Sequence, residues 1–379
     1  MLDRVLAILA VLSFLLTLWR WVVSERFPLH RRASTPDALP GLTLLKPLKG
    51  CNAETKPCLR SWFAQQYPGP VQILFGVASP DDPVCGVVRE LLAEFPGADA
   101  RLVVCGEKQG ANGKVSTLRQ LEAHIRHPLI MVSDADVEVS GDFAAGVAPL
   151  VAAPGAGLVN CFYGLANPAT TAMRWEAVAI NADFWSQVLQ ARSIAPVDFA
   201  LGAVMSLPAA RLRQIGGFAP LADHLADDYE LGRSIARAGG RIEFSSAVAD
   251  CREAPAGWKE VWKHQLRWAR TIRVCRPLPY FMSVLGNATV WPLLWLLLGR
   301  HPAAFPFCLA ALLFRMGSAA RQQRRLTQSN AHLAWWWLPP VKDLLDVLLW
   351  AAAFQGSKIE WQGERYRVLA GGKLVADQP

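Results

Sequence analysis

Short apolar runs alternate with helical patterns over residues 40–255, and this alternation constrains the fold more than any other feature of the sequence. The apolar runs have the length of strands, and the segments between them repeat apolar residues at helical spacing. Strands are expected at residues 42–45, 71–77, 101–104, 129–132, 157–163 and 200–207, and helices at residues 55–66, 84–95 and 115–125. The pattern predicts a mostly parallel sheet covered by helices, an α/β architecture typical of nucleotide binding.

Two carboxylates follow the fourth of these expected strands. The run 129–132 is apolar throughout, and Ser133, Asp134, Ala135 and Asp136 come directly after it. Open α/β sheets bind ligands at the carboxyl ends of their strands. Carboxylate oxygens at that edge suit Mg²⁺ or Mn²⁺ shared with substrate phosphates. A polar turn is the plainer alternative, because Asp is common in turns after strands.

A second acidic pair, Asp81 and Asp82, follows the expected strand 71–77. Its position suits a hydrogen bond to the ribose or the base of a nucleotide. The alternative is an Asp-Asp-Pro turn that caps the next helix, since carboxylates favour the positive end of a helix. On its own, this pair favours the capping interpretation.

Residues 110–114 (Gly-Ala-Asn-Gly-Lys) precede another expected helix. Flexible backbone, the Asn112 amide and the Lys114 ammonium would suit a loop that contacts a phosphate or uracil. The spacing is not that of a P-loop, and an ordinary loop explains the segment equally well.

Three carboxylates then fall within four residues of a helical stretch, at Asp227, Asp228 and Glu230. Mutual repulsion raises the proton affinity of at least one of them, which suits a general base. A solvated acidic helix face is the alternative, but the apolar neighbours Leu225 and Leu231 make full exposure less favourable.

Residues 258–276 interleave three tryptophans with lysines and arginines. This composition favours an amphipathic helix that lies on a membrane, with indoles at the headgroups and cations on anionic lipid. Within it, Arg267 suits a grip on a diphosphate leaving group and Trp268 a wall of the acceptor site. Both functions are compatible, because side chains leave one helix on different faces.

Residues 2–23 are nearly uninterrupted apolar sequence, about the 20 residues that a bilayer span requires. They lack a small-residue cleavage site, which favours an uncleaved anchor over a signal peptide. A basic cluster that includes Arg31 and Arg32 follows. Positive charge on that side predicts that the chain after the anchor faces the cytoplasm.

Apolar sequence returns towards the C-terminus. Residues 278–298 and 303–316 are expected to form a hairpin of two spans. Residues 331–354 contain Pro339 and Pro340 together with charged residues, so they are either a third span or a re-entrant or interfacial helix.

The composition fits a soluble domain with a few membrane segments, since 52% of residues are hydrophobic and only 18% are charged. The net charge is +8, but the basic residues gather beside apolar segments, where anionic lipid explains them. Nucleic acid is therefore not an expected partner. The eight cysteines show no metal-ligand spacing, so neither a zinc site nor a disulfide framework is expected.

Taken in order, these motifs resemble the family-2 type of nucleotide-sugar glycosyltransferase, and most closely the ceramide glucosyltransferase family, glycosyltransferase family 21. The resemblance runs nearly end to end, through residues 44–50, 81–83, 110–114, 133–136, 216–218, 226–229, 267–268, 359–361 and 365–367. The family signature is three aspartate motifs and a Gln/Arg-x-x-Arg-Trp box. The aspartates fall on Asp82, Asp134 and Asp228, and the box runs from His264 to Trp268, with His in place of Gln or Arg.

The resemblance implies a GT-A type nucleotide-sugar-binding domain and an inverting transfer of a hexosyl unit from a UDP-sugar to a membrane lipid hydroxyl. Asp136 is the less supported metal ligand, because some relatives have a non-acidic residue there. The expected site residues are Asp228, Arg267 and Trp268 for catalysis, Asp82, Asn112, Lys114 and His264 for the donor, and Asp134 and Asp136 for Mg²⁺ or Mn²⁺.

The segment from Arg267 to Pro277 resembles the bacterial branch of hopanoid-associated glycosyltransferases. That branch implies a bacteriohopanetetrol-type polyol lipid as acceptor and UDP-N-acetylglucosamine as donor, with ceramide and glucose as the alternative. A processive polysaccharide synthase and an inactive lipid-binding scaffold are less favoured. The chain is expected at the inner membrane, with an anchor (1–24), a cytoplasmic catalytic domain (25–256), an interfacial helix (257–277), C-terminal membrane or re-entrant helices (278–357) and a tail (358–379).

Overall fold

The computed structural model describes residues 1–31, 36–361 and 364–376, and these residues form two compact units. The sheet unit takes its described residues from 29–167, 196–254 and 372–379, and the helical unit takes them from 1–28, 168–195 and 255–371. Arg32 of the expected basic cluster and parts of the expected tail fall outside the described residues.

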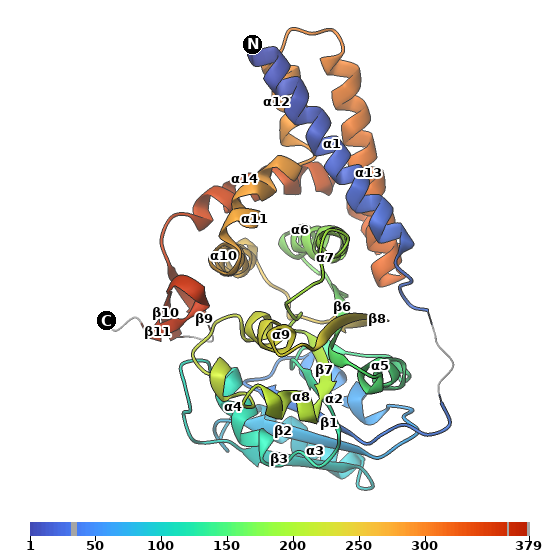
Figure 1. The fold of residues 1–379 in the computed structure, drawn as a ribbon, viewed down its shortest axis with the longest axis vertical. Helices are drawn as coiled ribbons and strands as arrows, with labels where there is room; N and C mark the ends of the chain where they lie inside the picture. Colours follow the sequence, from blue (N-terminus) through green and yellow to red (C-terminus); the bar gives the residue numbers. More distant parts are fainter. Residues whose placement is uncertain (32–35, 362–363, 377–379) are drawn as a thin grey trace. The chain divides into compact units, whose positions relative to one another are not determined.

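One eight-stranded sheet forms the framework of the sheet unit, in the order β3-β2-β1-β4-β7-β6-β8-β5 (Figure 1). The pairs β1–β2, β1–β4, β2–β3 and β6–β8 are parallel, whereas β7 is antiparallel to β4 and β6, and β5 is antiparallel to β8. The predicted mostly parallel α/β sheet is therefore confirmed. Its strands are β1 (Leu42–Leu48), β2 (Val71–Val77), β3 (Asp99–Val104), β4 (Leu129–Ser133), β5 (Val137–Glu138), β6 (Ala156–Leu165), β7 (Val204–Pro208) and β8 (Arg241–Cys251).

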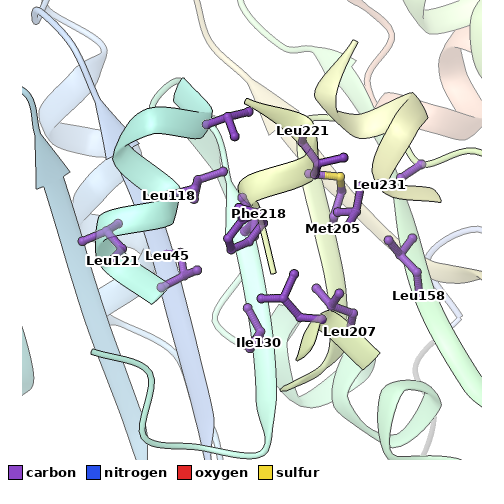
Figure 2. Close-up of a cluster of buried hydrophobic side chains, with 14 of the residues drawn as sticks. Leu45, Leu118, Leu121, Ile130, Leu158, Met205, Leu207, Phe218, Leu221 and Leu231 are labelled. Atoms are coloured by element: carbon purple, nitrogen blue, oxygen red, sulfur yellow. The ribbon is translucent and has the colours of Figure 1, made fainter. Parts of the chain in front are cut away.

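A buried apolar core joins this sheet to the helices on one face. In Figure 2, Leu118 points from a helix and Leu231 from another towards strand residues that include Ile130 and Met205. Burying side chains of this size is the main stabilising contribution to such a layer. The helices of the sheet unit are α2 (Thr55–Phe63), α3 (Val84–Glu94), α4 (Gly113–Glu122), α5 (Phe143–Ala152), α8 (Ala209–Gln214), the 3₁₀ turn η2 (Ala219–Leu221) and α9 (Asp227–Arg237), and a short strand β11 (Leu374–Ala376) follows later in the chain.

The helical unit begins with α1 (Leu2–Arg26), which runs beside α12 and α13 (Figure 1). Leu6 and Ala10 of α1 pack there on Trp295 and Ala304. The other elements of this unit are α6 (Thr171–Val178), the π-helical η1 (Ala179–Phe184), α7 (Trp185–Arg192), α10 (Trp258–Cys275), α11 (Pro277–Met282), η3 (Ser283–Gly286), α12 (Val290–Leu298), α13 (Ala304–Thr327), η4 (Ala331–Trp335), α14 (Leu338–Ala353), β9 (Lys358–Trp361) and β10 (Glu364–Val368).

Among the described residues, α1 is the one continuous helix long and apolar enough to cross a membrane. The segment expected to span at 278–298 is not one straight helix, because α11 with η3 and α12 meet at a bend of 53°. Asn287 stabilises this break, since its side-chain oxygen accepts hydrogen bonds from the backbone N–H groups of Thr289 and Val290. The pair is therefore a broken span or a re-entrant segment.

The other two expected segments also differ from the structure. Helix α13 continues to Thr327, well past the expected end at residue 316. Pro339 and Pro340 do not interrupt α14, because they lie in its first turn. A helix needs no backbone N–H donors from those positions, so proline begins a helix as readily as it breaks one.

Residues 168–195, which the sequence analysis included in the catalytic domain, belong to the helical unit instead. Asp183 in η1 explains this, because it is buried in an ion cluster with helices of that unit. Arg315 Nη2 lies 2.8 Å and Lys342 Nζ 2.7 Å from Asp183 Oδ2. The ion cluster consists of the cations Arg20, Arg315 and Lys342 and the carboxylates Asp183, Asp343 and Asp346.

Candidate active site

A buried lysine on the neighbouring strand β1 bonds to the carboxyl end of β4. Lys46 of β1 is fully buried, and its Nζ donates to Ser133 Oγ at 3.2 Å and to the backbone oxygen of Asp134. Its ammonium also lies 5.2 Å from the centre of the Trp62 ring. Burial lowers the pKa of Lys46 to about 8, although Asp136 and Asp134 oppose that shift. Lys46 therefore fixes the backbone that carries the two metal-ligand candidates.

Asp136 lies beside a cavity of about 380 Å³ at this edge of the sheet. Lys49, Asn52 and Arg252 line the same cavity. Burial, and then the neighbouring Asp134, raise the pKa of Asp136 to about 6. A cation that enters the cavity would therefore stabilise the ionised form of the Asp136 carboxylate.

The third aspartate motif begins α9. Burial, and then the adjacent Asp227, raise the pKa of Asp228 to about 7. The Asp228 carboxylate accepts a hydrogen bond from the Tyr229 N–H at 2.7 Å. A Cβ atom on Gly202 would lie only 2.9 Å from Asp228 Oδ2, so the absence of a side chain at that position leaves room for the carboxylate. A pKa near neutrality suits proton transfer at physiological pH.

Lys114 connects the second and third aspartate motifs. Its Nζ lies 2.5 Å from Asp134 Oδ1 and 3.6 Å from Asp227 Oδ2. Burial lowers the pKa of Lys114, but the carboxylates Asp134 and Asp227 more than offset this effect, so that the pKa is raised above its ordinary value. Four motifs that are far apart in the sequence thus meet at one edge of the sheet, namely residues 44–50, 110–114, 133–136 and 226–229.

The loop before Lys114, at residues 110–112, is fastened to the segment before α9. Asn112 is buried, and its side chain caps α4 by accepting from Val115 N and donating to the His224 carbonyl. Gly110 has φ +135°, and a Cβ there would lie 2.6 Å from Ala222 O, so glycine is required for this close approach. Any contribution of Asn112 to ligand binding therefore acts through the loop that it fastens.

Asp82 has the capping role considered for it, and it also bonds to the loop after β1. Its Oδ1 accepts from Val84 N at 3.0 Å, which caps α3, and both carboxylate oxygens accept from Gly50 N at 3.0 Å. Asp82 thus organises the loop after β1, next to the cavity that Gly50 lines. A contact with the uridine remains a prediction.

His264, Arg267 and Trp268 lie on α10, in the helical unit. The Trp268 ring packs against Phe184 at 5.9 Å and edge-on against His264 at 4.9 Å. The box therefore rests on α6–η1, the segment that the sequence analysis placed in the catalytic domain.

Glu176 is a polar partner of this box that the sequence analysis missed. It is fully buried on α6, and its Oε1 lies 2.7 Å from His264 Nδ1 and accepts from Gln265 Nε2 at 2.8 Å. A carboxylate this deeply buried is stable only when it is paired or hydrogen-bonded. The one signal in the sequence is a single acidic residue in a short helix whose other charged residue is Arg174.

The aspartates at the sheet edge fit a divalent cation that completes its coordination with ligand oxygens. Asp134 retains an exposed side-chain fraction of 37%, and Asp136 lines the cavity. Carboxylate oxygens are the hard donors that Mg²⁺ and Mn²⁺ prefer. No three His, Cys, Asp or Glu side chains of the described ranges converge as a complete metal site. A diphosphate and water would supply the remaining ligands.

A protein-family profile matches nearly the whole chain. Residues 5–374 match the sequence profile described as Glycosyl transferase family 21. The chain is 25% identical over 282 residues to ceramide glucosyltransferase 3 of Caenorhabditis elegans, covering 69% of this chain and 56% of that protein. It is 32% identical over 113 residues to ceramide glucosyltransferase of Candida albicans, covering 27% of this chain and 21% of that protein. The chain thus spans little more than half the length of the first of these relatives.

The fold is also similar to a solved structure, a mannosyltransferase from Pyrobaculum calidifontis in complex with GDP-Man and Mn²⁺. That likeness has a TM-score of 0.54 at 18% identity, and it covers 93% of this chain and 99% of the mannosyltransferase. The predicted GT-A type fold is therefore confirmed.

Proposed function

Because the chain belongs to glycosyl transferase family 21, we propose that it is a membrane-bound inverting glycosyltransferase that moves a hexosyl unit from a UDP-sugar to a lipid hydroxyl. The observation that carries this proposal is the convergence of Asp134, Asp227 and Asp228 with Lys114 at one sheet edge. Burial, and then the adjacent Asp227, raise the pKa of Asp228 to about 7, which suits a general base at this edge.

In this proposal the sheet edge binds the donor. The loop after β1, organised by Asp82, holds the uridine part. Asp134 and Asp136 hold the divalent cation, Mg²⁺ or Mn²⁺, and Lys46 keeps the backbone between them in place. When bound, the cation supplies positive charge to the departing diphosphate.

Asp228 is the general base. It removes the proton from the lipid hydroxyl while that oxygen forms a bond to the anomeric carbon on the face opposite the diphosphate. The bond between the anomeric carbon and the diphosphate breaks, and its electron pair leaves with UDP. A single displacement inverts the configuration, so an α-linked donor gives a β-linked product.

The family resemblance assigns the remaining roles. Arg267 neutralises the departing UDP, Trp268 walls the acceptor, and His264 contacts the donor. The Glu176 carboxylate supports that role of His264, because it fixes the Nδ1 side of the imidazole.

We propose a hopanoid polyol as acceptor and N-acetylglucosamine as the sugar, in a chain anchored in the inner membrane with the sheet unit in the cytoplasm. The anchor is α1. Ceramide and glucose are the second candidates, and the ceramide glucosyltransferases among the relatives favour them.

The test is transfer by the purified full chain in lipid vesicles. Each of UDP-N-acetylglucosamine and UDP-glucose is offered with each of bacteriohopanetetrol and ceramide, and mass spectrometry identifies the product. One glycolipid from one pair is the expected result. A ladder of longer products would indicate a polysaccharide synthase, and no product without any UDP binding would indicate an inactive scaffold.

A further inference from the structure

The carboxylate that would bind the metal already has a cationic partner from its own chain. Lys114 Nζ lies 2.5 Å from Asp134 Oδ1, and its side chain is only 13% exposed. Asp134 itself is 37% exposed, so a cation from solvent can reach it. The two contacts compete, because an ammonium at hydrogen-bond distance occupies the same carboxylate oxygen that a metal would use.

The second carboxylate within reach gives this ammonium another position. Asp227 Oδ2 lies 3.6 Å from Lys114 Nζ, and the Asp227 side chain is 10% exposed. Asp227 Oδ1 is 3.5 Å from the Asn112 amide, so its orientation is fixed from the other side. A small rotation of the lysine side chain would exchange Asp134 for Asp227 without breaking all its ion pairs.

Hydrogen bonds fasten the backbone just before Lys114, so an exchange of its ion pairs would come from rotation of the side chain. The Asn112 N–H donates to Ala222 O at 2.8 Å, and the Ala111 N–H donates to Asp223 Oδ1 at 2.9 Å. Lys46 is different, because it is fully buried and bonded to the Ser133 hydroxyl and to the backbone oxygen of Asp134. Lys114 is thus the cation at this edge that a flexible side chain can withdraw.

We propose that Lys114 is an internal counter-ion of Asp134 that is exchanged for the divalent cation when the sugar nucleotide binds. Lys114 withdraws from Asp134 and pairs with the incoming diphosphate and with Asp227. The free protein therefore binds the metal weakly, and metal and nucleotide bind with strong positive cooperativity. This inference takes the identity of the nucleotide from the proposed function. The competition between Lys114 and the metal at Asp134 is independent of that function.

The test measures Mn²⁺ binding to the purified full chain without nucleotide, by electron paramagnetic resonance of free Mn²⁺. Lys114→Met removes the charge at similar length, Lys114→Arg retains it, and Lys108→Met, an exposed position before the same loop, is the matched control. We expect Lys114→Met to bind Mn²⁺ about tenfold more tightly than the wild type, a coupling typical of linked sites. Lys114→Arg and Lys108→Met should match the wild type, and adding Asp134→Asn to Lys114→Met should remove the gain.

UDP binding by calorimetry, with Mn²⁺ and separately with EDTA, distinguishes the two proposals. Lys114→Met should bind UDP about tenfold more weakly in EDTA and should lose most of the cooperativity with Mn²⁺. If Lys114→Met has the Tm of the wild type but binds Mn²⁺ no more tightly, the counter-ion proposal is wrong. The proposed function is not affected by that result. Wild-type protein that binds no UDP with Mn²⁺ would sink the proposed function, while the Mn²⁺ titration still decides the competition. Lys114→Gln replaces Lys114→Met if the latter does not fold.

Discussion

The helical unit and the sheet unit each contain a group of charged side chains, and the two groups differ in balance. In the ion cluster, three cations meet three carboxylates, and Asp183 alone pairs with Arg20, Arg315 and Lys342. At the sheet edge, two ammonium groups face four carboxylates, and the members are Lys46, Lys114, Asp134, Asp136, Asp227 and Asp228.

The difference shows how one chain uses buried charge for two purposes. Charges that compensate one another offset much of their desolvation cost, and the elements that carry them stay in a fixed arrangement. At the sheet edge, burial and then a neighbouring carboxylate raise the pKa of Asp136 and of Asp228. A ligand cation would relieve the excess of negative charge there. We therefore expect charge removal to weaken the fold in the ion cluster and to weaken function at the sheet edge.

Asp228→Asn gives the largest expected effect and tests the sheet edge. Without its base, transfer should fall about 10³–10⁴-fold in kcat, while UDP binding with Mn²⁺ stays within about twofold. The free energy of unfolding should rise by about 1 kcal/mol, because active-site charge repulsion is relieved. Activity assays, calorimetry and thermal unfolding measure the three quantities.

Asp37→Asn is the matched control for this variant, since Asp37 is exposed and lies outside every motif. This variant should change neither transfer activity, nor UDP binding, nor the free energy of unfolding. Full transfer activity in Asp228→Asn would remove Asp228 from the mechanism.

Arg315→Met breaks the ion cluster and should produce the next largest effect. It leaves Asp183 and Asp343 short of a partner in a buried position, which should lower the free energy of unfolding by about 3–5 kcal/mol. Denaturant unfolding of the detergent-solubilised protein measures it. Arg321→Met, which removes an exposed arginine, should cost less than about 1 kcal/mol.

The double variant Arg315→Met with Asp343→Leu sharpens this test. It restores equal numbers of cations and carboxylates, so it should be more stable than Arg315→Met alone. If the double variant is the less stable of the two, charge balance is not what holds the cluster together.

The pH dependence of transfer tests the cause of the raised pKa of Asp228. The base acts when deprotonated, so kcat/KM should rise about tenfold per pH unit below a midpoint at about 7. The free energy of unfolding should change in the opposite direction over this pH range. Folding raises this pKa from 3.8, so the native state binds the extra proton between the two values and its stability falls as pH rises through that window.

Asp227→Asn removes the second cause of that shift, after burial, and should move the midpoint to lower pH. The pH profile of kcat/KM in this variant is the measurement. A midpoint that stays near 7 would assign the shift to burial alone.

Glu176→Ala should have the smallest effect of the series. It leaves His264 and Gln265 without their buried acceptor, which should lower kcat/KM by about tenfold. Glu176→Gln, which keeps a hydrogen-bond acceptor, should recover part of the loss. Glu260→Gln, on an exposed face of α10, should have no effect. Equal activity of Glu176→Ala and the wild type would separate Glu176 from the box.

The sequence predicts those parts of the fold and site whose signal is local. The apolar runs in β1, β2 and β4 are visible because burial on both faces makes a strand mostly apolar. The carboxylates that follow β2 and β4 are visible because they come directly after these runs. Strand β8 is not among the expected strands, because residues 241–251 mix charged and apolar side chains and the strand is only partly buried. A partly buried strand of this kind resembles a loop in composition.

The positions of Lys46 and Glu176 depend on partners far away in the chain. Lys46 bonds to a residue 87 positions away and Glu176 to one 88 positions away. No pattern within a window of helical or strand length carries that information. The same holds for Lys114, which the sequence places at a helix start but not against Asp134.

The empty space at Gly202 has a consequence for how relatives of this chain are compared. A methyl group there would press on the Asp228 carboxylate at 2.9 Å without altering any charged residue. A relative with every aspartate motif in place and a larger residue at this position would pass a motif search and still be a poor enzyme. Gly202 therefore belongs with the proposed site residues, although it contributes no functional group.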